Sequence, residues 1–235
     1  MSMSLMSVNV SRPVEVPYGD TAVTTGIFKR PVAGAVAVRH LNLDGDGQAD
    51  LVNHGGESKA VYAYSLDHYD YWREALGRDD LTYGQFGENL TVAGLDEAQL
   101  CVGDQLQIGD ALFTISQPRV PCFKLGIRFA DKRVPKMFAL SLRTGFYLRV
   151  LKEGTLEAGD TVDVVARGAG GLSIRSLFDA YLKPNDREAL RLLARAIEIP
   201  ELSPEWRGHI GERLARRPDP NRRTGDKRER DRRDQ

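Results

Sequence analysis

Residues 105–124 read QLQIGDALFTISQPRVPCFK, and this stretch is the most informative part of the chain. Apolar residues alternate with polar ones up to Ile108, the pair Gly109-Asp110 follows, and an apolar run returns from Ala111 to Ile115. A Gly-Asp pair between two such runs predicts a two-residue turn of hairpin type. Two prolines follow the second run and fix φ, so we expect the chain to leave the sheet stiffly there.

Other short strands are expected on both sides of this hairpin. Val36 alternates with Val38, residues 61–64 form an apolar run, and Val162 alternates with Val164 after a further Gly-Asp pair. Many short strands separated by glycine-rich turns favour a closed or nearly closed antiparallel barrel. The fold class expected is therefore mainly β with some α.

One helix is expected to interrupt the strands. Ser65 can cap it and Gly77 can end it. Between them, three apolar residues share one helical face: Tyr69, Trp72 and Leu76. A second short helix is plausible over residues 132–142.

Beyond Gly171 the apolar period changes from that of strands to that of helices. Ser173 can cap a first helix, Asn185 with Glu188 makes a capping-box-like start for a second, and Ser203 with Pro204 opens a third. Short amphipathic helices make little core alone, so these should pack together and against the barrel. We therefore divide the chain into three parts: a barrel at 1–170, a three-helix extension at 171–217, and a disordered charged tail at 218–235.

The composition indicates an ordinary globular protein, with 41% hydrophobic and 28% charged residues and a formal net charge of zero. Two cysteines are too few for a disulfide framework and fit a reduced compartment. The first eleven residues lack a basic start and a long apolar run, so we expect no signal peptide. With no window of membrane-span length, we expect a soluble, cytoplasmic protein.

Cys122 is the first candidate for chemistry. Arg119 and Lys124 flank it, and cationic neighbours lower the pKa of a thiol and favour the thiolate, which attacks electrophiles and binds soft metals. The alternative is that Cys122 is a small hydrophobic residue kept for packing. Cys101, in an apolar setting without a nearby cation, is interpreted as packing.

A second candidate lies around residues 53–59. Gly55 and Gly56 can expose backbone N–H groups as an anion site and Lys59 can add charge, although the glycines alone would equally suit a tight turn. Residues 44–55 are not an EF-hand, because glycine stands at loop position 12 instead of glutamate. His54 is interpreted as a loop histidine, since no second His or Cys stands at zinc-ligand spacing.

A third candidate lies in residues 83–92. Gly87 would allow the backbone to approach a ligand closely, and Asn89 offers an acceptor and donors suited to the edge of a heterocycle. The alternative is a polar turn before a strand.

Together, HGG at 54–56, FGENL at 86–90 and QPRVPCFK at 117–124 resemble MOSC-domain proteins, named for the C-terminal domain of molybdenum cofactor sulfurases. With the helical extension, residues 20–215 resemble the YiiM subgroup. The resemblance implies a β-rich barrel-like fold and a molybdopterin-type molybdenum cofactor, with Cys122 as the protein ligand to the metal. The cofactor-binding residues that it implies are His54, Gly55, Gly56, Lys59, Gly87, Glu88, Asn89, Gln117, Arg119 and Cys122. The catalytic residues that it implies are Cys122, Arg119 and Lys124.

The resemblance also implies an activity, the reduction of N-hydroxylated compounds such as hydroxylaminopurine bases, with an external flavin-type reductase as electron donor. Arg119 or Lys124 would then stabilise negative charge developing on oxygen. A second hypothesis is a non-catalytic protein that carries the cofactor or sulfur. A third gives the tail a nucleic-acid contact, which its interleaved acidic residues disfavour. The substrate, the donor and the oligomeric state are left open by the sequence.

Overall fold

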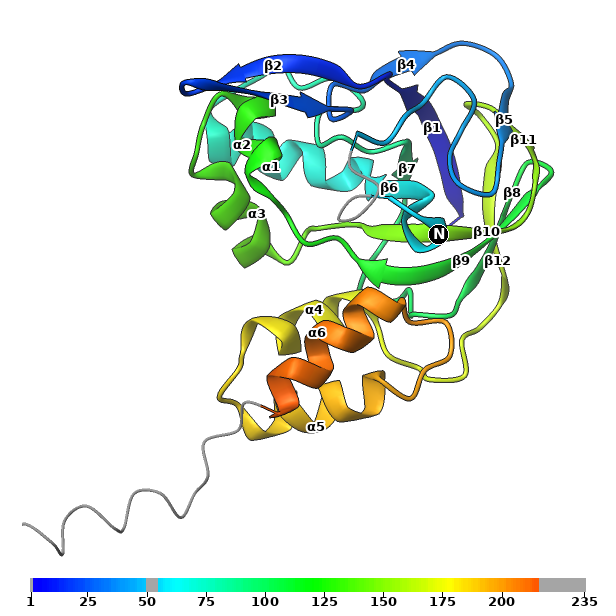
Figure 1. The fold of residues 1–235 in the computed structure, drawn as a ribbon. Helices are drawn as coiled ribbons and strands as arrows, with labels where there is room; N and C mark the ends of the chain where they lie inside the picture. Colours follow the sequence, from blue (N-terminus) through cyan, green and yellow to red (C-terminus); the bar gives the residue numbers. More distant parts are fainter. Residues whose placement is uncertain (1, 50–54, 216–235) are drawn as a thin grey trace, which may run out of the picture.

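The computed structural model describes residues 2–49 and 55–215, which form a β-barrel followed by three helices (Figure 1). The barrel strands are joined in the order β12-β8-β9-β10-β6-β7-β1, and β1 also pairs with β12, which closes a ring of seven. All the pairs are antiparallel except β6 with β7. The ring confirms the predicted barrel, with one parallel pair that was not expected. Its strands are β1 (Met3–Val10), β6 (Val61–Ser65), β7 (Leu90–Ala93), β8 (Gln105–Ile108), β9 (Ala111–Pro118), β10 (Phe146–Lys152) and β12 (Thr161–Ala166).

The hairpin predicted around Gly109 is present as β8 and β9, with Ile108 opposite Ala111 and a φ of 52° at Gly109. The strand does not end at Ile115, however, because Pro118 still pairs with Phe146 of β10. Proline is tolerated here because it is the last residue of the strand, where a missing N–H interrupts no further pairing. The chain leaves the sheet only after Pro118.

Within residues 2–49 and 55–215, five further strands lie outside the ring. β4 (Arg30–Val32) extends the sheet from β1, and β5 (Val36–Val38) pairs with β11 (Gly154–Leu156). β2 (Val14–Tyr18) and β3 (Thr21–Thr25) form a separate hairpin, which reaches over the helices at the upper left of Figure 1.

Three helices stand between the barrel strands in sequence. α1 (Tyr69–Leu76) ends at Gly77 as predicted, with a φ of 61°, and α3 (Val134–Ser141) lies within the predicted range 132–142. The predicted cap at Ser65 is wrong: a 3-10 turn at Leu66–His68 comes first, and the Ser65 hydroxyl donates to the Leu95 carbonyl. α2 (Phe123–Phe129) was not predicted.

The extension consists of α4 (Ile174–Leu182), α5 (Arg187–Ala196) and α6 (Pro204–Ala215). Ser173 caps α4 by accepting from the Ser176 N–H, and the Ser203 hydroxyl accepts from the N–H of Trp206. The cap of α5 is Asp186, not Asn185: its carboxylate accepts from two backbone N–H groups in the first turn. Asp is favoured because its charge also complements the helix dipole.

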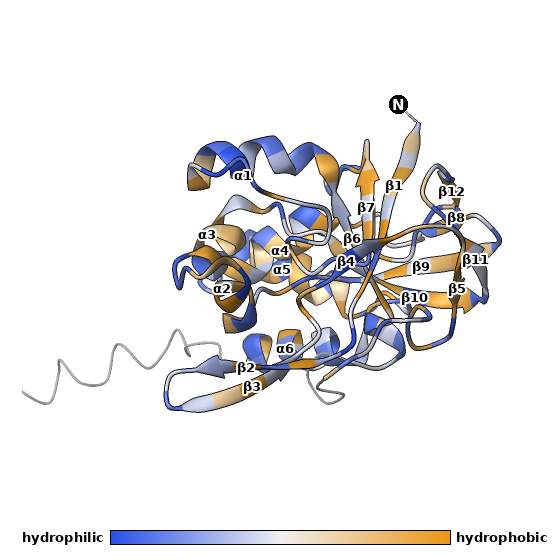
Figure 2. Cartoon of the chain, turned by 90° about the horizontal axis from the view of Figure 1, so that it is seen from above, coloured by the Kyte–Doolittle hydropathy of each residue, from blue (hydrophilic) through white to orange (hydrophobic). Residues whose placement is uncertain are grey.

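The extension packs on the barrel as expected. Leu177, Phe178 and Trp206 are buried in the same apolar cluster as Phe113 and Leu148 of the barrel strands. In Figure 2 the barrel strands are largely apolar in colour, whereas the exposed face of α1 is hydrophilic. The charged tail predicted at 218–235 lies outside the described residues.

A second core, rich in aromatic rings, lies beneath α1 and α3. Phe86 contacts Tyr64, Trp72 and Phe138 with ring centroids 4.6 to 5.8 Å apart. Within residues 2–49 and 55–215, no helix has the length and apolar character needed to span a membrane.

Candidate functional site

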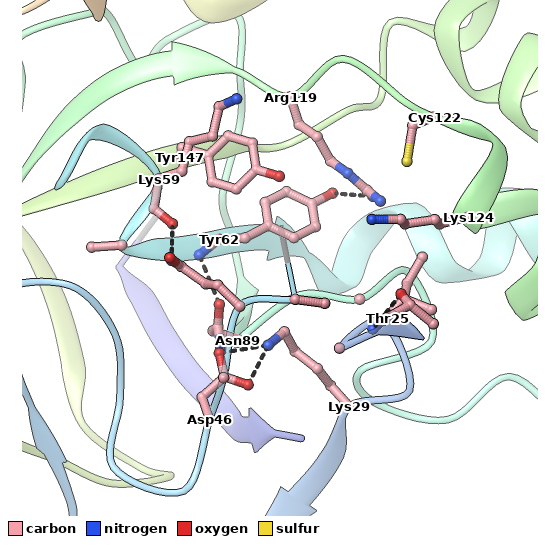
Figure 3. A pocket seen from close by; sticks show the side chains of 17 residues that line it. Thr25, Lys29, Asp46, Lys59, Tyr62, Asn89, Arg119, Cys122, Lys124 and Tyr147 are labelled. Carbon is pink, nitrogen blue, oxygen red and sulfur yellow. Dashed lines mark hydrogen bonds and ion pairs between the residues drawn. The ribbon is translucent and has the colours of Figure 1, made fainter. Parts of the chain in front are cut away.

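A cavity lies where β9 ends and where the chain enters β6 and β7 (Figure 3). Its volume is about 100 Å³, and the depression reaches about 640 Å³ when the solvent-filled space at its mouth is included. The described residues that line it come from well-separated parts of the sequence. They are Thr25, Gly26, Ile27, Lys29, Asp46, Gly47, Gln48, Ala49, Lys59, Ala60, Tyr62, Gly87, Asn89, Arg119, Cys122, Lys124 and Tyr147.

Three of the predicted catalytic residues meet at this cavity. Cys122 is half-buried and stands immediately before α2, with the stiff Pro121 ahead of it. Arg119 and Lys124 lie near it at the same end of the cavity in Figure 3. A thiol beside cationic side chains is suited, as the thiolate, to bind a soft metal.

Arg119 is built into the protein and is only 6% exposed. Its Nη1 donates to the Phe86 carbonyl at 2.7 Å and to the Tyr62 hydroxyl at 3.1 Å. Burial by itself lowers the pKa of Arg119, but the nearby ionisable groups of Tyr62, Tyr147 and Cys122 leave this pKa above its ordinary value. The guanidinium is therefore a fixed positive charge beside the thiol.

Tyr62 and Tyr147 form a wall that the sequence analysis missed. Their ring centroids are 5.3 Å apart, and the Tyr62 hydroxyl donates to the Thr144 carbonyl at 2.7 Å. Burial raises the pKa of both phenols, against the opposing effect of the Arg119 charge. Both remain neutral at ordinary pH and contribute no charge to the cavity. The Tyr62 proton is already used in the hydrogen bond to Thr144.

A buried ion pair, also missed, lies at the opposite end of the cavity. The Lys29 ammonium is 2.5 and 2.6 Å from the two carboxylate oxygens of Asp46 (Figure 3). Burial lowers the pKa of Lys29, and the Asp46 charge opposes that effect. Because the two charges cancel locally, the excess positive charge lies toward Arg119 and Lys124.

Asn89 lines the cavity, but its side chain forms hydrogen bonds with other residues of the protein. Oδ1 accepts from the Tyr62 N–H at 3.0 Å, while Nδ2 donates to the Asn9 carbonyl at 3.2 Å and to Asp46 at 2.9 Å. Both amide protons are thus used within the protein. The expectation that Asn89 donates to a heterocycle edge is corrected accordingly.

Lys59 lines the cavity, as predicted for a residue that meets an anion, but it also forms an ion pair with Glu205 of α6. Gly87 lines it too, with a φ of 78°. A Cβ at this position would lie 2.8 Å from Cγ1 of Ile27, so close packing as well as the positive φ requires glycine.

Four of the predicted cofactor-binding residues do not line the cavity: Gly55, Gly56, Glu88 and Gln117. Glu88 faces inward and accepts from the N–H groups of Gly84 and Phe86 and from two hydroxyls, so it organises its own loop. Gln117 is buried in β9, and its Oε1 accepts no hydrogen bond within the described residues. His54 lies outside the described residues.

The donor set suits an anionic group that carries a soft metal. The cavity is lined by one thiol and by the cations Lys59, Arg119 and Lys124. An anionic group bound there would compete with the Glu205 carboxylate for Lys59. In the described part of the chain, no cluster of three or more His, Cys, Asp or Glu side chains could hold a metal ion. The cavity volume of about 100 Å³ admits only part of a pterin-sized ligand, and the remainder fits the open depression at its mouth.

Comparison with known proteins agrees with this geometry. The MOSC domain family matches residues 50–163, and the YiiM-like, 3-alpha helix domain family matches residues 173–217. "Uncharacterized protein YflK" of Bacillus subtilis (strain 168) is 41% identical over 204 residues, which are 87% of this chain and 91% of that protein. "Reductase" of Gibberella moniliformis (strain M3125 / FGSC 7600) is 34% identical over 181 residues, 76% of this chain but 32% of that longer protein.

The crystal structure of YiiM from Geobacillus stearothermophilus superimposes with a TM-score of 0.75 at 38% identity. The alignment covers 90% of this chain and 99% of that one. Barrel and helical extension are therefore shared along almost the whole length. The chain belongs to the MOSC family, in the YiiM-like group that carries the three-helix extension.

Proposed function

We propose that this protein binds a molybdopterin-type molybdenum cofactor through Cys122 and reduces N-hydroxylated compounds, of which hydroxylaminopurine bases are the model substrate class. The observation that carries the proposal is the half-buried Cys122 thiol beside the buried Arg119 guanidinium in a cavity lined by further cations. Membership of the MOSC family and a relative named "Reductase" support it. The bound cofactor would supply the two-electron redox chemistry.

The residues of the protein would bind the cofactor and orient it. Lys59 and Lys124 attract the anionic cofactor, and charge-assisted hydrogen bonds from such cations are each worth roughly 1.5–3 kcal/mol when desolvated. Arg119 is held in one orientation by the Phe86 carbonyl and Tyr62, so its charge needs no reorganisation during the reaction. It can therefore stabilise negative charge as an N–O bond lengthens.

The overall reaction takes a hydroxylamine, two electrons and two protons and gives an amine and water. The electrons would come from an external flavin-type reductase and the protons from solvent. The neutral Tyr147 phenol stands at the cavity wall beside Arg119, where it can donate a hydrogen bond to an anionic group of the bound cofactor.

The test is expression in a host that synthesises the cofactor, followed by elemental analysis and reduction of 6-hydroxylaminopurine with a flavin reductase. We expect about one molybdenum per chain and turnover in the wild type, and loss of both in Cys122→Ser with an unchanged circular dichroism spectrum. Cys101→Ser is the matched control, because burial and the neighbouring Asp104 raise the pKa of the Cys101 thiol and disfavour the thiolate.

The outcomes separate the hypotheses. Molybdenum without turnover of any N-hydroxylated base would favour the cofactor or sulfur carrier. A Cys122→Ser protein that keeps molybdenum and full turnover would refute Cys122 as the ligand.

A further inference from the structure

A second hollow, of about 520 Å³, borders Cys122. It lies between the tip of the β2–β3 hairpin and α2, which are neighbours in Figure 1. Its described lining residues share only Cys122 with the lining of the first cavity. The thiol therefore stands at the boundary between two separate spaces.

The second hollow, which we call the aromatic groove, has an unusual wall. Tyr18 at the end of β2 is 40% exposed and Phe123 at the start of α2 is 44% exposed. Their ring centroids are 5.0 Å apart with an angle of 44° between the rings. Pro121 and Ile127 line the same space. Two large aromatic rings left open to solvent in a concavity provide a stacking surface for a flat ligand.

The different volumes of the two spaces favour different ligands. Small-molecule pockets commonly measure roughly 300–1,000 Å³, which includes the aromatic groove but not the cavity of about 100 Å³ beside Arg119. An anionic cofactor would already fill the Arg119 cavity and its mouth. An organic substrate must then reach Cys122 from another side, and the aromatic groove is the space that borders it.

Resting on the function proposed above, we propose that the aromatic groove binds the planar nitrogen-heteroaromatic ring of the substrate, stacked on Tyr18 and Phe123, with its N-hydroxylated substituent toward Cys122. The groove also offers polar partners for ring nitrogens. The Asp131 carboxylate can accept and the Lys132 ammonium can donate, and both line the groove. Asp131 is held in place by Arg133, whose Nη2 donates to it at 2.7 Å.

The shape favours a small ring over a protein partner. A stable protein interface needs about 800 Å² on each side, whereas the exposed apolar feature here is a concavity with two aromatic rings. A purine base fits this arrangement. Its flat faces can stack on the two aromatic rings, and its edge carries hydrogen-bond acceptors and donors.

The test uses the full chain prepared without cofactor, titrated with the fluorescent base 2-aminopurine. We expect saturable binding to the wild type and about tenfold weaker binding to Tyr18→Ala and to Phe123→Ala, the loss typical of a removed stacking partner. Tyr71→Ala is the matched control, since Tyr71 is 39% exposed on α1 and lines neither hollow. In the loaded enzyme the two groove variants should raise KM for 6-hydroxylaminopurine by a similar factor with little change in kcat.

Binding that is equal in wild type and both groove variants would overturn the inference, whatever the activity. So would turnover by the loaded wild type with no detectable base binding by the cofactor-free protein. Self-association that the two variants abolish, without base binding, would assign the groove to a second copy and likewise overturn it. Base binding that depends on Tyr18 and Phe123 in a protein without reductase activity would support the groove and refute only the proposed reaction.

Discussion

Glu205, in the first turn of α6, forms an ion pair with Lys59 at the cavity of the barrel. The Lys59 side chain is 7% exposed and that of Glu205 is 39% exposed. A buried ammonium needs a nearby negative charge, because desolvating an unpaired ion is costly. The extension therefore provides the counter-charge for a lysine that an anionic ligand would otherwise neutralise.

Replacing Glu205 by Gln should strengthen anion binding at the cavity. Without the carboxylate, one negative charge that competes for Lys59 is removed, and we expect inorganic phosphate to bind the cofactor-free protein about three- to tenfold more tightly at low salt. Calorimetric titration measures this. Glu198→Gln, an exposed change in the same extension, is the control. Weaker phosphate binding in Glu205→Gln would show that the pair positions Lys59 for the ligand instead of competing with it.

Replacing Glu88 by Gln should destabilise the fold without acting on the cavity directly. The carboxylate accepts four hydrogen bonds, and an amide would place its own NH₂ against some of those donors. The expected loss is about 2–4 kcal/mol in urea unfolding, with Glu57→Gln as an exposed control. A Glu88→Gln protein of wild-type stability that loses molybdenum would instead restore Glu88 as a cofactor-binding residue.

Alkaline pH should unfold the protein through its buried phenols. Burial raises the pKa of Tyr62, Tyr64, Tyr69 and Tyr147 above the ordinary value of 10.0. The unfolded chain therefore releases these protons first. Stability is intact below about pH 10 and then falls by up to about 1.4 kcal/mol per pH unit for each phenol. Tyrosinate absorbance and circular dichroism should change together for this group. Ionisation of all the tyrosines near pH 10 without loss of structure would contradict the prediction.

Cutting the chain after Gly170 should expose apolar barrel surface, because Leu177, Phe178 and Trp206 share a core with the barrel strands. We expect a lower melting temperature and poor solubility. Cutting after Arg217 removes a stretch without apolar side chains other than proline and should leave the melting temperature unchanged. A barrel that is fully soluble with the wild-type melting temperature after the first cut would show that the extension is an independent module.

The features that the sequence predicted are those set by neighbours in the chain. The turn at Gly109, the helix stop at Gly77 and the cap at Ser173 each depend on residues within one turn of the backbone. The cap of α5 was placed one residue early, at Asn185, because two adjacent side chains there are both good capping residues.

The side chains that line the cavity are held by contacts between residues far apart in the sequence, which a local sequence pattern does not predict. Lys29 meets Asp46 across 17 residues, and Asn89 meets Asn9 across 80. Arg119 lines the cavity, but its hydrogen-bond partners Phe86 and Tyr62 come from other parts of the chain and could not be predicted from its motif. Motif resemblance picked out residues around Cys122 that line one cavity in the fold, but it could not predict which of these side chains hydrogen-bond within the protein.

The pairing of Met3 with Val162 has a consequence for the order of events during synthesis. β1 leaves the ribosome well before two of its partners, β7 and β12, which lie at Leu90–Ala93 and Thr161–Ala166. Val8 can pair early with Val32 of β4, but Leu5, which is fully buried in the finished protein, lies opposite Val92 of β7 and gains this partner only when that segment emerges. Pairings so distant in sequence are slow to form, typically on a scale of roughly milliseconds to seconds. β1 is thus made long before its pairing within the barrel can be completed.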